Sequence, residues 1–85
     1  MKDSAIYFNL AITFMNKKKP EDAAAYFSKA IELDPASADS YFYRGMAEFQ
    51  TKKNAEARAD FKKYLELDPN GAEAKDAKEM LQALK

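Results

Sequence analysis

The feature that most constrains the fold of this chain is a repeat of its own sequence at an offset of 34 residues. The segment IELDP at residues 31–35 recurs as LELDP at residues 65–69. Over one full period, twelve residues of the first half meet identical residues in the second: Tyr7, Phe8, Lys18, Lys19, Ala23, Ala25, Phe27, Lys29, Glu32, Leu33, Asp34 and Pro35. A fixed period of this length is typical of stacked units of secondary structure, each of which buries its apolar face against a neighbour. The chain is therefore predicted to contain two such units.

Each unit is predicted to be a pair of helices joined by a polar turn. Apolar residues recur at spacings of three and four, which places them on one face of a helix. Pro20 suits the first turn of a helix, because its missing N–H would have no partner there. The Asp34-Pro35 pair is expected to end that helix, because Pro disfavours helical backbone at the residue before it. The predicted helices cover residues 4–16, 20–33, 38–51 and 55–67.

Residues 72–85 are predicted to form a fifth helix. Its apolar residues make a narrow stripe between charged ones, so one side packs and the other meets water, as expected of a terminal cap on a repeat array. The predicted fold is therefore all-α, with antiparallel helix-turn-helix repeats stacked as a short α-solenoid. We expect a single domain over residues 1–85, with repeat one at about 4–37, repeat two at about 38–71 and the capping helix at about 72–85.

The composition excludes most catalytic and metal chemistry. The 85 residues include no Cys and no His, so the chain has no thiolate nucleophile, no imidazole base and no thiolate or imidazole ligand for zinc or copper. Acidic pairs such as Glu21 and Asp22 fall in the first turn of a helix, where the helix dipole explains them without catalysis. Lys plus Arg and Asp plus Glu number 14 each, so no surplus of positive charge favours nucleic acid. We expect no catalytic residue, no metal, no cofactor and no enzyme activity.

The N-terminal apolar stretch does not have the properties of a targeting segment. Residues 5–15 are followed by the lysines at 17–19, whereas a signal peptide carries its positive charge before the apolar region. The stretch is also shorter than the roughly 20 apolar residues that span a bilayer. We therefore expect a soluble, cytoplasmic protein without membrane insertion.

The two units resemble tetratricopeptide repeats (TPR), whose pattern is W-x2-L-G-x2-Y, then A-x3-F, then P. The residues that carry the resemblance are Tyr7, Leu10, Ala11, Phe14, Ala23, Phe27, Ala30 and Pro35 in the first unit and Tyr41, Gly45, Ala57, Phe61 and Pro69 in the second. Arg44 and Glu48 depart from the Leu and Tyr positions, which is expected to weaken the packing of that helix slightly. The resemblance implies a right-handed superhelix whose first helices line a concave groove that binds peptides.

Large apolar residues are predicted to occupy the groove side of the first helix in each unit. The residues placed there as a partner-binding surface are Phe8, Asn9, Ile12, Met15, Phe42, Tyr43, Met46, Phe49 and Gln50. An exposed apolar stripe of this extent normally marks an interaction surface. We expect it to bind a hydrophobic or amphipathic peptide, and we expect Phe42→Ala or Met46→Ala to weaken binding with the fold intact. Alternatively, the same face forms a homodimer or contacts neighbouring repeats in a larger scaffold.

A second expectation concerns the kind of peptide. Relatives that grip the C-terminal carboxylate of chaperones use Lys, Asn and Arg side chains in the groove. The corresponding positions of this chain hold Phe8, Ile12, Tyr43, Glu73 and Ala77. Because none of these side chains can clamp a carboxylate, recognition of a chaperone tail in that way is disfavoured.

Overall fold

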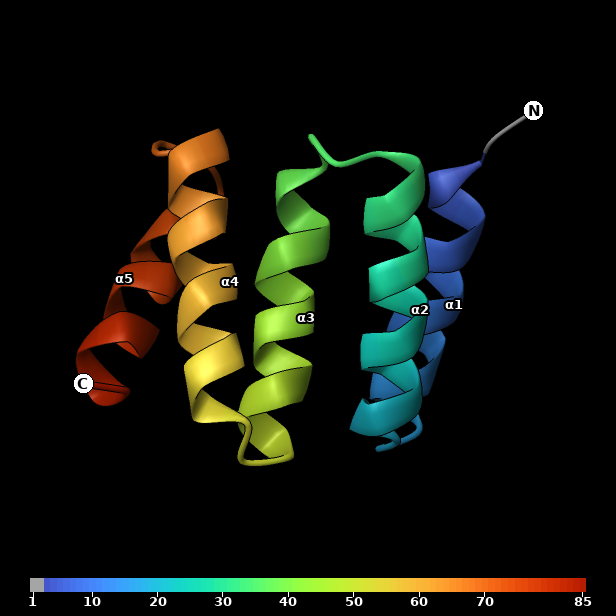
Figure 1. Ribbon diagram of the computed structural model, residues 1–85, viewed down its shortest axis with the longest axis horizontal. Helices are drawn as coiled ribbons and strands as arrows, with labels where there is room; N and C mark the ends of the chain where they lie inside the picture. Colours follow the sequence, from blue (N-terminus) through green and yellow to red (C-terminus); the bar gives the residue numbers. More distant parts are fainter. Residues whose placement is uncertain (1–2) are drawn as a thin grey trace.

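The computed structural model describes residues 3–85, and this part of the chain contains five α-helices and no strand. In chain order they are α1 (Ser4–Asn16), α2 (Pro20–Leu33), α3 (Ala38–Gln50), α4 (Asn54–Leu67) and α5 (Ala74–Ala83), as Figure 1 shows. The predicted helices and their order are confirmed, and the largest differences in bounds are at α5. Within residues 3–85, no helix combines the length and apolar character that crossing a membrane requires.

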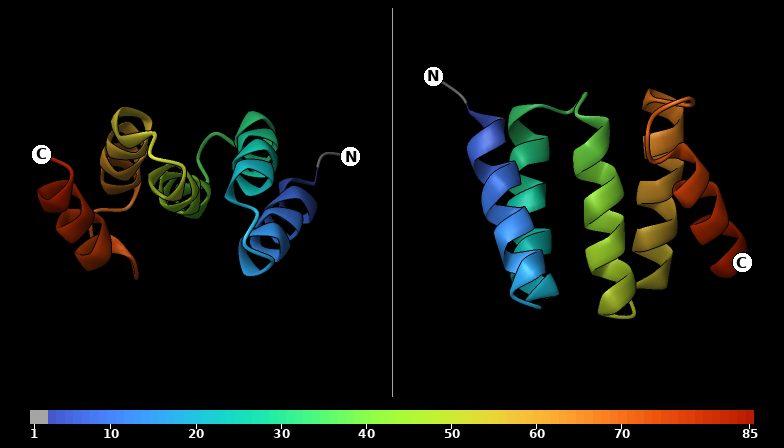
Figure 2. Two further views of the ribbon diagram at one scale, coloured as in Figure 1. Left: turned by 90° about the horizontal axis from the view of Figure 1, so that it is seen from below. Right: turned by 180° about the vertical axis from the view of Figure 1, so that it is seen from behind.

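The helices form two hairpins and a cap. α1 packs against α2 and α3 against α4, while α2 joins the first hairpin to the second and α4 carries α5. Seen along the helices, α2 and α4 lie on one side of the molecule, and α1, α3 and α5 lie towards the other (Figure 2). The predicted all-α repeat architecture is therefore confirmed, with the first helix of each hairpin and the cap sharing one face.

The two hairpin turns end their first helices in the same way. After α1, the N–H of Lys19 donates to the carbonyl of Phe14 at 2.9 Å and the N–H of Lys18 donates to that of Met15 at 3.0 Å. This is the Schellman arrangement, in which the residue after the helix has left-handed backbone and is usually Gly. In the turn after α1 that residue is Lys18, with φ of 62°. In the turn after α3 it is Lys52, with φ of 65°. Both turns therefore hold a lysine in a backbone region that favours glycine.

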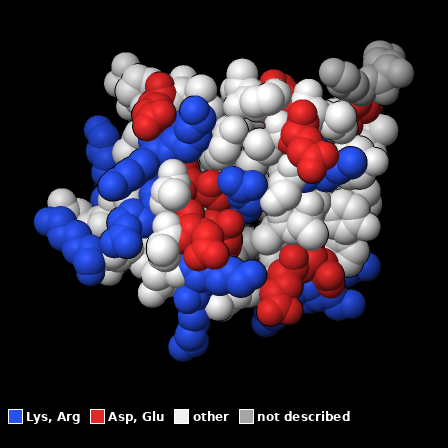
Figure 3. Space-filling model, in the orientation of Figure 1, with Lys and Arg blue, Asp and Glu red and all other residues white. Residues whose placement is uncertain are grey.

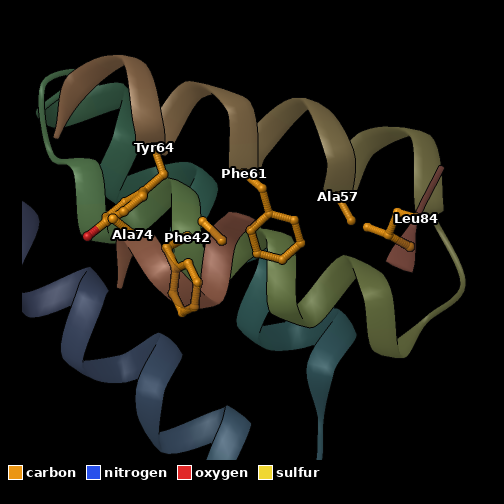
Figure 4. Close-up of a cluster of buried hydrophobic side chains, with 7 residues drawn as sticks. Phe42, Ala57, Phe61, Tyr64, Ala74 and Leu84 are labelled. Atoms are coloured by element: carbon orange, nitrogen blue, oxygen red, sulfur yellow. The ribbon is translucent and has the colours of Figure 1, made fainter. Parts of the chain in front are cut away.

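Small and aromatic residues interlock in the core as the sequence predicts. Phe27 and Phe61 have no exposed surface. A Cβ atom on Gly45 would lie 3.0 Å from the ring of Phe61, so the absence of a side chain lets α3 approach α4 closely. The larger buried cluster spans α3, α4 and α5 (Figure 4) and consists of Phe42, Ala57, Phe61, Tyr64, Ala74, Ala77 and Leu84.

The start of α5 is fixed by Tyr64, which has no exposed surface. The backbone N–H of Glu73 donates to the Tyr64 hydroxyl at 2.9 Å. A Cβ atom on Gly71 would overlap this hydroxyl and the carboxylate of Asp68, so a larger residue there would displace one or both side chains. The prediction that the fifth helix begins at residue 72 is therefore wrong by two residues, because residues 71–73 form the turn that rests on Tyr64 and α5 begins at Ala74.

The two departures from the repeat pattern belong to a polar cluster between helices. The Arg44 guanidinium binds both carboxylate oxygens of Asp60, from Nε at 2.7 Å and from Nη2 at 2.8 Å. Its Nη1 donates to the hydroxyl of Ser28 at 3.2 Å. Arg44 therefore connects α3 to α4 and to α2, which the sequence analysis did not foresee because it treated Arg44 only as a loss of apolar packing.

Glu48 lies beside this pair, where its neutral form is favoured. Its Oε2 is 3.6 Å from Nε of Arg44, whereas its Oε1 is buried without a hydrogen-bond partner. Burial, followed by the interaction with the Asp60 carboxylate, raises the pKa of Glu48 to about 8, and the charge of Arg44 opposes this shift only in part. A neutral carboxyl at this position avoids placing two negative charges beside one guanidinium.

Candidate functional site

A groove of about 380 Å³ opens between α1, α3 and α5, on the side of the molecule that these helices share. Its lining residues are Met15, Phe42, Tyr43, Met46, Glu73, Asp76, Glu79 and Met80. Three of them are methionines, whose flexible side chains adapt to apolar partners of different shape. The groove is therefore apolar along its floor and acidic along α5.

Aromatic contacts fix the floor of the groove. The ring of Tyr43 meets that of Phe42 edge-on, with centroids 5.1 Å apart, and lies parallel to that of Phe27 at 6.2 Å. The Tyr43 hydroxyl donates to Oε2 of Glu73 at 3.2 Å. Burial, followed by the negative charge of Glu73, raises the pKa of Tyr43, so its hydroxyl stays protonated and keeps donating. This hydrogen bond ties α5 to α3 across the groove.

The carboxylates of Glu73, Asp76 and Glu79 give the α5 side of the groove its negative charge. No Lys or Arg of residues 3–85 lines the groove. Among residues 3–85, none of these three carboxylates has a Lys or Arg nitrogen within 4 Å. Within that range, no group of three or more potential ligands is arranged to hold a metal ion. The three acids are therefore available to positive groups from outside the chain.

The structure brings four of the nine predicted surface residues together in this groove, namely Met15, Phe42, Tyr43 and Met46. Phe8 and Ile12 instead pack against the buried cluster between the hairpins. The Phe8 ring contacts that of Phe27 edge-on, with centroids 5.6 Å apart. Three further residues, Asn9, Phe49 and Gln50, are exposed but do not line the groove.

The prediction that Phe42 is an exposed groove residue is wrong. Its side chain is 3% exposed and its ring packs against those of Phe61 at 5.6 Å and Tyr64 at 5.5 Å (Figure 4). The reason is that α5 folds onto α4 and encloses the end of α3 that carries Phe42. Phe42 is thus both the deepest part of the groove floor and a core residue, and its removal is expected to disturb the fold.

The sequence analysis missed Asp76, Glu79 and Met80 on the capping helix. The signal was present, because adding the 34-residue offset to Phe42 and Met46 gives Asp76 and Met80. The sequence analysis applied the offset to the capping helix only at Glu73 and Ala77, although Met46 and Met80 are identical at the same offset. Extending it would have placed this side of the capping helix on the groove.

Comparison with known proteins identifies a matching protein family and solved structures of similar fold. The protein-family model described as Tetratricopeptide repeat matches residues 8–72. Among solved structures, the first TPR of Spaghetti (RPAP3) bound to the HSP90 peptide SRMEEVD has a TM-score of 0.86 and 31% identity over 96% of this chain. The second TPR domain of human RPAP3 in complex with the HSP70 peptide SGPTIEEVD has a TM-score of 0.86 and 27% identity, also over 96%.

A third similar structure is the Arabidopsis OM64 TPR domain, with a TM-score of 0.87 and 30% identity over 95% of this chain. The chain spans 66% of the length of each of the two RPAP3 domains and 67% of that of the OM64 domain. No curated protein matches the chain.

Proposed function

Because this chain belongs to the tetratricopeptide repeat family, we propose that it is a noncatalytic protein–protein interaction module. Its partner is a hydrophobic or amphipathic peptide segment, which lies in the groove between α1, α3 and α5. In the same proposal, residues 4–37 and 38–71 are the two repeats and residues 72–85 are the cap of a single domain. Peptide binding by two of the similar TPR structures supports this function.

The observation that carries the proposal is the apolar groove itself. A groove of about 380 Å³ falls within the size range of sites that bind small groups or side chains. Met15, Met46 and Met80 come from three different helices and meet there. Each of these side chains is only partly buried, so a partner's apolar side chain gains contact area without displacing the core.

The same geometry argues against catalysis. In the part of the chain that the structure describes, the ionisable groups on the groove are three carboxylates and the Tyr43 hydroxyl, which donates to Glu73. The lining offers neither an activated nucleophile nor a pair of acid and base groups on opposite sides of a substrate. The mechanism we propose is therefore binding alone.

A nuclear magnetic resonance titration tests the proposal. The probe is a short synthetic amphipathic peptide with Leu at every third or fourth position and Gln elsewhere, added to the 15N-labelled chain. We expect saturable shift changes that cluster at residues lining the groove. A two-repeat groove is short, so we expect a Kd in the micromolar range or weaker.

Two variants complete the test. Met46→Ala removes a partly buried side chain from the groove and should weaken binding about fivefold or more, by losing a contact at its centre. Leu67→Ala is the matched control, because Leu67 is 37% exposed and does not line the groove. Shift changes scattered over the surface, or equal affinity in both variants and the wild type, would contradict the proposal.

A second candidate function is self-association through the outer face of α1. Ile6 is 56% and Leu10 38% exposed. Their counterparts one repeat later, Ser40 and Arg44, lie at the α2 side of α3, where Ser40 is buried and Arg44 reaches Ser28 of α2. Because Ile6 and Leu10 form one stripe, two copies of the chain that pack α1 against α1 in antiparallel orientation would bury both stripes.

Sedimentation equilibrium over a hundredfold concentration range separates the two surfaces. Ile6→Glu charges the outer face of α1, and Met46→Glu charges the groove. A dimer that only Ile6→Glu dissociates supports assembly through α1, and one that only Met46→Glu dissociates makes the groove the interface. A wild-type monomer at every concentration would rule out this second candidate.

A further inference from the structure

The charge of the groove indicates which kind of peptide it accepts. Glu73 at the N-cap of α5 and Asp76 and Glu79 within the helix follow one another at intervals of three residues. With a rise of about 1.5 Å per residue, their backbone positions extend over about 9 Å of the helix. A ligand lying against α5 therefore meets negative charge along two turns of helix.

Among residues 3–85, no Lys or Arg forms an ion pair with these carboxylates. The lysines of α5 nearest in sequence, Lys75 and Lys78, do not line the groove, and neither lies within 4 Å of a carboxylate oxygen among residues 3–85. Glu73 uses one oxygen to accept the Tyr43 hydrogen bond and keeps the other. The described charges of the groove are thus all negative, although the chain as a whole carries no net charge.

This segregation of charge is a local property of the groove. The face on which α2 and α4 lie carries Lys or Arg and Asp or Glu side by side (Figure 3). Mixed charges of that kind keep a protein in solution without selecting a partner. In contrast, a single sign of charge beside an apolar floor attracts ligands of the opposite sign and orients them.

The peptides bound by the two RPAP3 domains are acidic, whereas the acidic groove of this chain should attract basic ligands. SRMEEVD and SGPTIEEVD both end in two Glu, a Val and an Asp. In this groove such an end would lie beside three carboxylates, and like charges in close contact are repulsive. The residue at the centre of the α5 side, Asp76, would face it with no positive group lining the groove beside it.

We propose that the groove binds a basic amphipathic peptide segment, an inference that rests on the proposed function. The apolar side chains of the segment contact Met15, Met46 and Met80, and its Lys or Arg side chains lie along α5. There they pair with Asp76 and Glu79 and with the free oxygen of Glu73. The groove thus selects against acidic chaperone tails.

Three synthetic peptides with identical Leu positions test this inference, with Lys, Gln or Glu at the remaining positions. Binding is measured by the same nuclear magnetic resonance titration at low salt. We expect the Lys peptide to bind roughly tenfold tighter than the Glu peptide, since each exposed ion pair adds only a modest attraction and up to three pairs can form. The difference should shrink in ~1 M salt, where charges are screened beyond about 3 Å.

A pair of matched variants assigns the preference to the groove. Asp76→Asn with Glu79→Gln removes two charges from α5 and should abolish most of the preference for the Lys peptide over the Glu peptide. Glu21→Gln with Asp22→Asn changes the net charge equally in the first turn of α2, where neither residue lines the groove. This control should keep the preference, because screening limits the effect of distant charges.

The outcomes separate this inference from the function on which it rests. If no peptide produces shift changes at the groove, the proposed function fails. If the Gln peptide binds there and the Lys and Glu peptides bind equally well, the groove is a peptide site without charge selection, and only the inference is wrong. If the Glu peptide or SRMEEVD binds more tightly than the Lys peptide, the inference is also wrong.

Discussion

Replacing Arg44 alone should destabilise the fold more than replacing Arg44 together with Asp60. The Asp60 side chain is 7% exposed, and Arg44 binds both of its carboxylate oxygens, at 2.7 and 2.8 Å. Arg44→Met removes both donors and leaves a buried carboxylate. The double variant Arg44→Met with Asp60→Leu removes the charge as well and fills the site with apolar atoms of similar volume.

The expected magnitude follows from the burial of the pair. Breaking a buried ion pair on one side costs about 3–5 kcal/mol, because the remaining charge has no partner. The side chain of Arg44 is 22% exposed, so water reaches part of this site and the lower value, about 3 kcal/mol, is the better estimate. For a domain of this size that corresponds to a fall in Tm of about 12–24 °C. The double variant should stay within about 1 kcal/mol of the wild type or exceed it.

Urea unfolding followed by circular dichroism at 222 nm measures these differences. The measurements should be made at pH 6, because the pKa of Glu48 is raised to about 8. At pH 6 this third carboxyl is protonated in the folded wild type. Unchanged slopes of free energy against urea would show that the unfolded states are comparable.

Either of two results would refute this reasoning. If Arg44→Met stays within about 1 kcal/mol of the wild type, water solvates Asp60 well enough to replace the guanidinium. If the double variant loses as much as the single one, the contribution of Arg44 lies in the packing of its stem and its contact with Ser28, not in its pairing with Asp60.

Three further predictions concern stability. Between pH 4.5 and about 8 the folded state holds the Glu48 proton more tightly than the unfolded state, so the free energy of unfolding falls as pH rises. Glu48→Gln should remove this fall, which urea unfolding at pH 5 and pH 9 measures. Lys52→Gly should raise stability by roughly 0.5–1 kcal/mol, seen as a higher Tm, because φ of 65° is strained for Lys; an unchanged or lower Tm would contradict this. Phe61→Ala should lower the free energy of unfolding by about 3–5 kcal/mol, which is a large part of the stability of a small domain. A variant that keeps its helical circular dichroism signal to the same urea concentration as the wild type would contradict this.

The helices and their order could be predicted from the sequence because their signals are local. The 34-residue offset and the three- and four-residue spacing identified four of the five helices almost to the residue, and Pro20 and Pro35 marked where α2 begins and ends. Backbone hydrogen bonds within a helix join residues four apart, so a short window of sequence contains most of what decides the helix. The same locality let Phe27 and Phe61 be assigned to the core.

The composition of the groove could be predicted only in part. Met15, Tyr43 and Met46 were placed correctly by helical geometry, because each lies on the same face of its helix as its neighbours one turn away. Whether that face meets water depends on which other helix covers it. Sequence periodicity gives the direction of a side chain relative to its own helix axis and carries no information about the distance to the next helix.

The tertiary structure decided the position of α5, and with it the character of the site. Tyr64 binds the backbone of Glu73, and Gly71 fits a space that a larger residue could occupy only by displacing the side chains of Tyr64 or Asp68. This seating encloses Phe42 in the core and turns Asp76 towards the groove. Contacts between residues far apart in sequence set the rotation and distance of packed helices. Sequence alone therefore determined that a repeat module forms, whereas the packing of its last helix decided that the groove is acidic.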